Sequence, residues 1–305
     1  MDLGTRIEAA MERAFELTCT HAPPRLAEAL RHAVFPGGAR IRPRLCLAVS
    51  VACGEDEPRL GDAAAAALEF IHCASLVHDD LPCFDDAVLR RGRPSLHREF
   101  GEDLALLAGD GLIVTAFEQL ARQPTAHAAR LAELLAIIAR ASGPAEGIVA
   151  GQAWESEDRV DLERYHRSKS AALFRAATSC GAIAAGSPVA PWAACGELLG
   201  EAYQVADDLA DRIGDCATLG KPICRDRTLG RPSAVSEHGL LGALAHLDRL
   251  SLQARDSIPP CADRRSLVEL FEFVVARLCP PAMRHAVERV LACEREPDSD
   301  SALSA

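Results

Sequence analysis

The sequence predicts an all-α fold that forms a single domain. Of the 305 residues, 49% are apolar but only 4% are aromatic. The apolar residues are dominated by Ala, Leu and Val, which favours helices over a β-rich fold. Apolar positions recur at the helical period, whereas the alternation typical of strands is scarce. Because no change in composition marks a boundary, we expect residues 1–294 to form one domain and the polar residues 295–305 to form a flexible C-terminal tail.

About ten helices are expected from this periodicity, and proline and glycine mark several of their ends. The first follows Pro23-Pro24, runs through Leu26, Leu30 and Val34, and stops at the turn Phe35-Pro36-Gly37-Gly38. The others are expected over residues 61–81, 101–121, 131–141, 144–154, 161–185, 191–212, 236–254 and 264–278. Pro144 and Pro191 then stand in the first turn of their helices, where proline is tolerated.

The charge and the cysteines limit the function classes. The net charge of −11 argues against a nucleic-acid partner, because nucleic-acid binding needs a basic surface. Phosphate substrates stay open, since metal ions bridge acidic proteins to acidic ligands. None of the 12 cysteines forms a C-x-x-C pair, and several lie in apolar runs, which predicts thiols in a reducing cytoplasm. The N-terminus lacks the apolar segment of a secretion signal, and no run of about 18 apolar residues predicts a membrane span.

The first acidic cluster is His78-Asp79-Asp80-Leu81-Pro82-Cys83-Phe84-Asp85-Asp86, at the end of the long apolar helix. Carboxylates at a helix C-terminus face the negative end of the helix dipole, so a positive group has to offset them. Pro82 interrupts the helical hydrogen bonds. We therefore expect the chain to bulge at Pro82 and to return Asp85 or Asp86 to the side of Asp79.

The second acidic cluster is Gln204-Val205-Ala206-Asp207-Asp208-Leu209-Ala210-Asp211. Asp207 and Asp211 are four residues apart on one helix face, where like charges repel unless a cation lies between them. Clustered carboxylates suit a hard cation such as Mg²⁺, which takes few protein ligands and shares itself with substrate phosphates. One such cluster alone is equally well explained as a solvated helix face. Two clusters on apolar helices, each followed by basic residues, favour a site for metal and diphosphate.

Cations beside glycine turns and beside the acidic clusters are candidate phosphate ligands. They are Arg40, Arg42 and Arg44 after Gly37-Gly38, Arg90 and Arg91 before Gly92, Lys169 between two serines, and Lys221 after Gly220. Arginine matches phosphate oxygens with two parallel hydrogen bonds, and lysine acts as a point charge. His72 lies seven residues before Asp79, on nearly the same helix face. A lone histidine is usually a core residue, so His72 is a phosphate donor only if this face lines a pocket.

Taken together, these residues resemble the trans-isoprenyl diphosphate synthase family, most closely its bacterial geranylgeranyl and farnesyl diphosphate synthases. The matching stretches are Gly37–Pro43, Ile71–Asp80 with Arg90-Arg91-Gly92, Gly109-Asp110, Gly151-Gln152, Lys169-Ser170, and Gln204–Asp211 with Gly220-Lys221. They follow the family's order over most of residues 35–235. The six-residue step from Asp79 to Asp85 resembles the longer, bacterial version of the first motif.

The resemblance implies an isoprenoid-synthase-type bundle whose two acidic clusters face each other across a central cavity. It implies a homodimer and about three Mg²⁺ ions, with Mn²⁺ as a substitute. The implied metal ligands are Asp79, Asp85, Asp207 and Asp211, supported by Asp80, Asp86 and Asp208. The allylic diphosphate would contact Arg90, Lys169, Ser170, Gln204 and Lys221, and isopentenyl diphosphate would contact Arg42, His72 and Arg91.

Three positions depart from the family's pattern. Ala39 stands where the family usually has lysine after the glycine pair, which removes a positive contact to isopentenyl diphosphate. Arg40 or Arg42 is a possible substitute for that contact. Arg231 replaces a common lysine and keeps the charge, and Ser170 replaces a threonine and keeps the hydroxyl.

The resemblance implies the condensation of isopentenyl diphosphate with dimethylallyl, geranyl or farnesyl diphosphate. In this family a large aromatic residue five positions before the first aspartate stops growth at C15. Ala74 and Ser75 are small here, so the predicted product is the C20 compound geranylgeranyl diphosphate. A C15 product remains an alternative. Two rival hypotheses are a terpene cyclase, which needs no second anion site, and a non-catalytic regulatory subunit, which only Ala39 favours.

Overall fold

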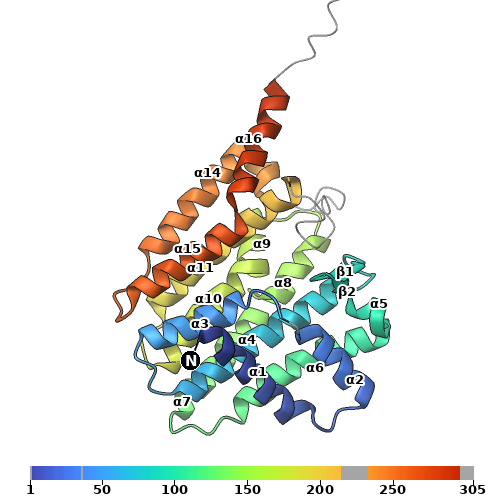
Figure 1. The fold of residues 1–305 in the computed structure, drawn as a ribbon, viewed down its shortest axis with the longest axis vertical. Coiled ribbons are helices and arrows are strands. Elements are labelled where there is room, and N and C mark those ends of the chain that lie inside the picture. Colours follow the sequence, from blue (N-terminus) through green and yellow to red (C-terminus); the bar gives the residue numbers. More distant parts are fainter. Residues whose placement is uncertain (1, 36, 214–232, 296–305) are drawn as a thin grey trace, which may run out of the picture.

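The computed structural model describes residues 2–35, 37–213 and 233–295, and these residues confirm the all-α prediction (Figure 1). Its helices are α1 Leu3–Cys19, α2 Pro24–Val34, α3 Ile41–Ala52, α4 Pro58–Asp79, α5 Leu96–Phe100, α6 Glu102–Ala121, α7 Ala128–Ser142, α8 Ile148–Ala153, α9 Leu162–His166, α10 Ala172–Ala184, α11 Ala190–Ile213, α14 Ala234–Asp256, α15 Arg264–Leu278 and α16 Pro281–Arg295. A 3₁₀ turn, η1 (Trp154–Ser156), follows α8, and a π-helical turn, η2 (Arg167–Ala171), joins α9 to α10. The strands β1 (Leu89–Arg90) and β2 (Arg93–Pro94) form one short hairpin. Of the predicted tail, residues 295–305, Arg295 is the last residue of α16, and residues 296–305 lie outside the described part of the chain.

The helices α1, α3, α5 and α16 are additions to those expected from the sequence. One predicted boundary is wrong, because α8 begins at Ile148 and Pro144 lies in the preceding turn, which the hydrogen bond from Gly147 N–H to the Gly143 carbonyl closes. The single helix expected over residues 161–185 is interrupted by the π-helical turn η2. Such π-helical turns are frequent at functional sites.

Helix α4 is the central helix of the bundle. It packs against α1, α3, α6 and α10, and most of its 22 residues are buried. Five consecutive alanines, Ala63–Ala67, are 4% exposed or less, and their small side chains let the neighbouring helices approach closely. Because α4 is surrounded by other helices, the acidic residues at its C-terminal end are held at a fixed place in the bundle.

A buried ion pair fixes the turn before α3 onto α4. Arg40 is 4% exposed and donates to Glu69 of α4 at 2.8 Å, to Glu8 of α1 at 2.8 Å and to the Val34 carbonyl at 2.9 Å. Breaking a pair of this kind leaves an uncompensated buried charge, which costs about 3–5 kcal/mol. Arg40 is therefore a structural residue, and it is not available to replace the lysine that is absent at position 39.

Helices α4 and α6 are the two described helices that are long and apolar enough to cross a membrane. In α4, 78% of the relevant window is buried, as in the core helix of a bundle. In α6 the share is 44%, and Leu106, Leu107 and Val114 are about half exposed or more. Helix α6 thus exposes several large apolar side chains on one part of its surface.

Candidate active site

One cleft brings together the residues that the sequence singles out. Its walls come from α3, α4, the segment that follows α4, α8, η2 and α11. It is lined by Arg42, His72, Ser75, Leu76, Asp79, Asp85, Ala87, Arg90, Ile148, Gln152, Lys169, Ser170, Tyr203, Gln204, Asp207 and Asp211. Both acidic clusters therefore face the same space, although they are more than 120 residues apart in the sequence.

The first cluster has the bulge that Pro82 predicts. Helix α4 ends at Asp79, and the backbone N–H of Asp85 donates to the Asp79 carbonyl at 2.9 Å. This bond closes the turn and places both residues on the cleft wall. Asp86 has a left-handed backbone and turns away from the cleft, where its carboxylate accepts a hydrogen bond from Arg98 at 2.7 Å. Asp85, and not Asp86, is thus the residue that returns to the side of Asp79.

The β1–β2 hairpin supplies the positive charge that the end of α4 requires. Its two turn residues, Arg91 (φ 54°) and Gly92 (φ 75°), have the left-handed backbone of tight hairpin turns. Arg90, just before them, binds both carboxylate oxygens of Asp80, which is 2% exposed. Burial raises the pKa of Asp80, and the Arg90 hydrogen bond opposes that rise. Burial alone would lower the pKa of Arg90, but the hydrogen bond to Asp80 and the negative charges of Asp80, Asp79 and Asp85 together raise it.

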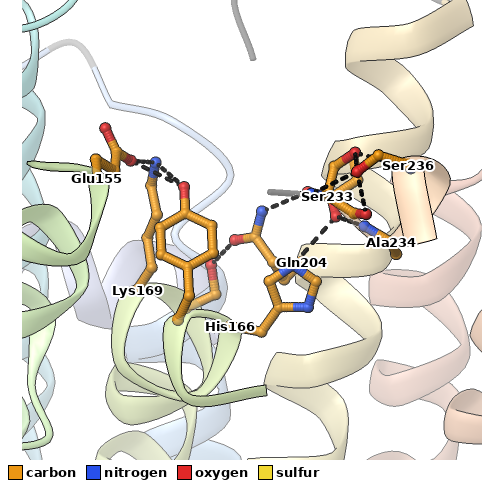
Figure 2. Close-up of polar contacts among 10 residues, drawn as sticks. Glu155, His166, Lys169, Gln204, Ser233, Ala234 and Ser236 are labelled. Atoms are coloured by element: carbon orange, nitrogen blue, oxygen red, sulfur yellow. Dashed lines mark hydrogen bonds and ion pairs between the residues drawn. The ribbon is translucent and has the colours of Figure 1, made fainter. Parts of the chain in front are cut away.

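The second cluster divides between two faces of α11. Asp207 and Asp211 line the cleft, as their four-residue spacing predicts. Asp208 is 3% exposed and accepts hydrogen bonds from the Ala234 backbone N–H at 2.7 Å and from Gln204 at 2.8 Å. In Figure 2, Gln204 is drawn between Lys169 and Ala234, which is the first residue of α14. Asp208 thus anchors the start of α14 to α11 and has no place on the cleft wall.

Arg42 and His72 form a second cationic region at the same cleft. Arg42 is 6% exposed, its guanidinium lies over the rings of Phe174 and Tyr203, and its Nε has no hydrogen-bond partner among the described residues. Burial lowers the pKa of Arg42. Burial and the neighbouring Arg42 also lower the pKa of His72 well below its usual value, so its imidazole is neutral. A buried guanidinium without an ion-pair partner in the described part of the chain is suited to binding an anion.

Arg91 lies at the edge of this region, against the glycine turn. A Cβ on Gly38 would stand 3.0 Å from the Arg91 guanidinium, so the turn and the arginine are in direct contact. The Arg91 guanidinium is 3.8 Å from Glu69, which Arg40 also binds. The turn Gly37-Gly38-Ala39 is therefore part of the same cationic region, and Ala39 contributes no charge to it.

Lys169 and Ser170 lie on η2 and face the cleft. Lys169 donates to Glu155 and, at 2.9 Å, to the hydroxyl of Tyr165, and Ser170 donates to Gln204. Burial alone would lower the pKa of Lys169, but Tyr165, Glu155 and Asp79 raise it well above its usual value. Figure 2 shows Lys169 and Glu155 pointing toward one another. The remaining predicted contact, Lys221, and also Arg231, lie outside the described residues.

The two small residues proposed to control chain length occupy different environments. Ser75 lines the cleft, and its hydroxyl donates to the His72 carbonyl at 2.8 Å. Ala74 is 1% exposed and belongs to the main apolar core. On α4 the cleft is lined by residues 72, 75, 76 and 79, the spacing of a single helix face.

Several residues at the site were not assigned a role from the sequence. Gln152 of α8 donates to Asp79 at 2.7 Å, and Glu155 and Tyr165 hold Lys169. The only available signal was the Gly151-Gln152 pair. A Cβ on Gly151 would lie 2.5 Å from the Cα of Lys169, so glycine is required where α8 packs against η2. Glu155 and Tyr165 have no sequence pattern that distinguishes them from surface residues.

The residues facing the cleft fit a hard divalent cation by their chemistry. Asp79, Asp85, Asp207 and Asp211 offer only carboxylate oxygens, which Mg²⁺ prefers. In the described ranges, no three His, Cys, Asp or Glu side chains converge into a complete metal cage. That arrangement suits an ion that takes one or two carboxylates and completes its coordination with water and substrate phosphate.

Comparisons with known proteins agree with this geometry. A profile of the polyprenyl synthetase family matches residues 23–252. A geranylgeranyl diphosphate synthase from Cereibacter sphaeroides is 52% identical over 92% of this chain and 98% of its own length. One from Rhodobacter capsulatus is 47% identical over 91% and 96%. A crystal structure of a geranyltransferase from Helicobacter pylori, complexed with magnesium and isoprenyl diphosphate, is 28% identical with a TM-score of 0.72, covering 93% of this chain and 98% of that one.

Asp207 lines the cleft, whereas Asp208 is buried against α14, and this difference leads to a stability prediction for Asp208. In Asp208→Asn, the amide NH₂ has to face either the Gln204 NH₂ or the Ala234 N–H, so one donor loses its acceptor. We expect the free energy of unfolding to fall by about 1–3 kcal/mol. Urea denaturation followed by circular dichroism measures this change. Asp256→Asn, at the exposed C-terminal end of α14, is the matched control, and an equal effect in both variants would contradict the anchoring role of Asp208.

Proposed function

The chain belongs to the polyprenyl synthetase family, and on this premise we propose that it condenses isopentenyl diphosphate with an allylic diphosphate to make geranylgeranyl diphosphate. The observation that carries the proposal is the single cleft that holds two acidic clusters and two separate groups of cations. Two anion sites beside one another are what a condensation of two diphosphates requires. The identity of 52% and 47% to two geranylgeranyl diphosphate synthases supports the C20 product.

Magnesium is the proposed cofactor, with about three ions per site and Mn²⁺ as a possible replacement. Asp79 and Asp85 would hold ions on one wall, and Asp207 and Asp211 on the other. A cation held by these residues would supply positive charge to offset the negative charge that develops on a departing diphosphate. The magnesium in the Helicobacter pylori structure supports this assignment.

The two substrates are assigned to neighbouring parts of the cleft. Arg90, Lys169, Ser170 and Gln204 would bind the diphosphate of dimethylallyl, geranyl or farnesyl diphosphate, together with Lys221. Arg42, His72 and Arg91 would bind isopentenyl diphosphate. The neutral imidazole of His72 acts there as a hydrogen-bond donor, and the guanidinium of Arg42 supplies the charge.

The proposed reaction begins when the allylic C–O bond breaks, which leaves an allylic cation and a diphosphate. Arg90 and Lys169 stabilise the diphosphate charge as it develops. The double bond of isopentenyl diphosphate then attacks the cation, and a proton is lost to the departing diphosphate. No side-chain base is required. Leu76, Ile148 and Tyr203 line the cleft beside these groups, and their apolar surfaces help to keep water from the cation.

A homodimer is proposed from the apolar face of α6, where Leu106, Leu107 and Val114 are 49%, 54% and 61% exposed. Sedimentation equilibrium of the whole chain is expected to give twice its mass of 32.5 kDa. Leu107→Asp should shift the chain to the monomer, because it places a charge in an apolar contact. A monomeric parent chain would contradict the assignment.

We also propose a cytoplasmic location without a membrane span. Recovery of the untagged chain in the membrane pellet of lysed cells would contradict this proposal.

The product assay tests the proposed function and its length control together. With Mg²⁺, isopentenyl diphosphate and each allylic primer, we expect the C20 product by chromatography. Ser75→Phe should shift it toward C15, because Ser75 lines the cleft and the ring would occupy the space of the growing chain. Ala74→Tyr should act in the same direction but also destabilise the fold, since Ala74 is buried in the core and overpacking costs about 1–3 kcal/mol.

The outcomes of this assay separate the alternatives. A C15 product from the parent chain would establish the farnesyl alternative. A hydrocarbon made from geranylgeranyl diphosphate alone would indicate a cyclase, and no product with any primer would favour a regulatory subunit. Ala139→Phe, on the exposed face of α7, is the control for an added aromatic ring and should leave product length unchanged. Unchanged C20 output in Ser75→Phe would contradict the role of Ser75.

Ala39 allows a separate test of the isopentenyl diphosphate site. Arg40 is held by Glu8 and Glu69 and does not replace the missing lysine, so Arg42 and Arg91 carry the charge. Ala39→Lys should lower the KM for isopentenyl diphosphate by about tenfold, because a charge-assisted hydrogen bond contributes about 1.5–3 kcal/mol. The KM for the allylic substrate should stay the same. Steady-state kinetics with each substrate varied in turn measures both, and equal changes in the two values would contradict the assignment.

A further inference from the structure

The ammonium of Lys169, the carboxylate of Glu155 and the hydroxyl of Tyr165 form a closed triangle of hydrogen bonds at the cleft wall. Lys169 donates to the carboxylate of Glu155 and to the hydroxyl of Tyr165, at 2.9 Å for the latter. The Tyr165 hydroxyl in turn donates to the same Glu155 oxygen at 2.8 Å. Tyr165 is 2% exposed, and the side chains of Glu155 and Lys169 are 8% and 22% exposed. The ammonium is thus shielded from most of the solvent and is already paired with a carboxylate.

The backbone fixes this triangle from both sides. Tyr165 and Lys169 are four residues apart across the π-helical turn η2, which begins between them. Glu155 comes from η1, and the close approach of Gly151 to the Lys169 Cα holds that segment against η2. Three residues before Glu155, Gln152 donates to Asp79 of the first acidic cluster at 2.7 Å. One short segment therefore holds both a cluster aspartate and the cleft lysine.

The pairing has a consequence for any diphosphate that binds to Lys169. The ammonium has three N–H donors, and two of them are directed to Glu155 and Tyr165. A diphosphate anion placed beside Lys169 is also placed near the negative charge of Glu155. The anion and the carboxylate therefore compete for the same cation.

We infer that Glu155 is a positioning residue that competes with the allylic diphosphate for Lys169, and so weakens diphosphate binding and aids its release. This inference rests on the proposed function for the identity of the substrate, and on the geometry of Lys169, Glu155 and Tyr165 for the competition. Glu155 holds the ammonium at the cleft wall while the cleft is empty. When the reaction leaves inorganic diphosphate at Lys169, the carboxylate of Glu155 pairs with the ammonium again and displaces the diphosphate.

The test is Glu155→Gln, which keeps the shape and the hydrogen-bond acceptor but removes the charge. Calorimetric titration of the whole chain with inorganic pyrophosphate and Mg²⁺ is expected to show a dissociation constant about fivefold lower than in the parent, which corresponds to about 1 kcal/mol. The KM for the allylic substrate should fall by a similar factor, and the KM for isopentenyl diphosphate should not change. A merely structural role for Glu155 predicts the opposite, weaker binding of pyrophosphate.

Two controls isolate the effect. Glu157→Gln makes the same charge change two residues away at an exposed position and should leave pyrophosphate binding unchanged. In a Lys169→Met background, Glu155→Gln should strengthen binding much less, because competition for the ammonium is then removed and only direct repulsion between Glu155 and the anion is left. Weaker binding in Glu155→Gln, or an equal gain in the Lys169→Met background, would overturn the inference. The pyrophosphate titration needs no turnover, so its result stands apart from the product assay that tests the proposed function.

Discussion

Carboxylates that repel one another are gathered at one cleft, and the surrounding structure is organised by the need to hold them there. Asp79 and Asp80 end an apolar helix at the negative end of its dipole, which is unfavourable without a counter-charge. Arg90 provides that charge through hydrogen bonds to both carboxylate oxygens of Asp80, and Gln152 donates to Asp79. The hairpin that carries Arg90 and the helix that carries Gln152 are thus placed by the same electrostatic requirement. Arg90 is consequently paired with an acidic group of the first cluster before any ligand arrives.

The cations Arg40, Arg42 and Lys169 differ in how open they are to a negatively charged ligand. Arg40 is enclosed by Glu8, Glu69 and the Val34 carbonyl, so its charge is committed to the fold. Arg42 lies over two aromatic rings with no ion pair in the described part of the chain, so its charge is open to an anion. Lys169 lies between these extremes, paired but at the cleft surface. Arg40 and Arg42 are both buried, at 4% and 6% exposed, so the presence or absence of a carboxylate partner gives them their different roles.

Much of the fold and part of the site could be predicted from the sequence. Helices with a strong apolar period, such as α4, α6, α11 and α15, were predicted because their burial depends on local spacing. Helix α3 was missed because it begins with Ile41-Arg42-Pro43-Arg44, where charge and proline hide the period. The return of Asp85 follows from Pro82, a local cause. The opposite orientations of Asp207 and Asp208 do not, because neighbouring helical residues differ by about 100° and only the packing of α14 decides which one faces the cleft. Glu155 and Tyr165 depend on the contact between α8 and η2, which no local pattern encodes.

The two walls of the cleft are held by different kinds of contact, and α11 connects them. The first wall is fixed by bonds among α4, the turn after it and the hairpin, all within about twenty residues of sequence. The second wall is fixed at a distance. The N-terminal half of α11 packs into the main core through Trp192, Cys195 and Leu199, and its C-terminal half packs with α14 into a second apolar cluster. Asp208 strengthens this second contact, because it accepts a hydrogen bond from the backbone N–H of Ala234, the first residue of α14, and lies on the same helix as Asp207 and Asp211. The separation between the two acidic clusters is therefore set by how α11 sits in both cores, and a change at the α11–α14 contact alters the site without touching any residue that faces the cleft.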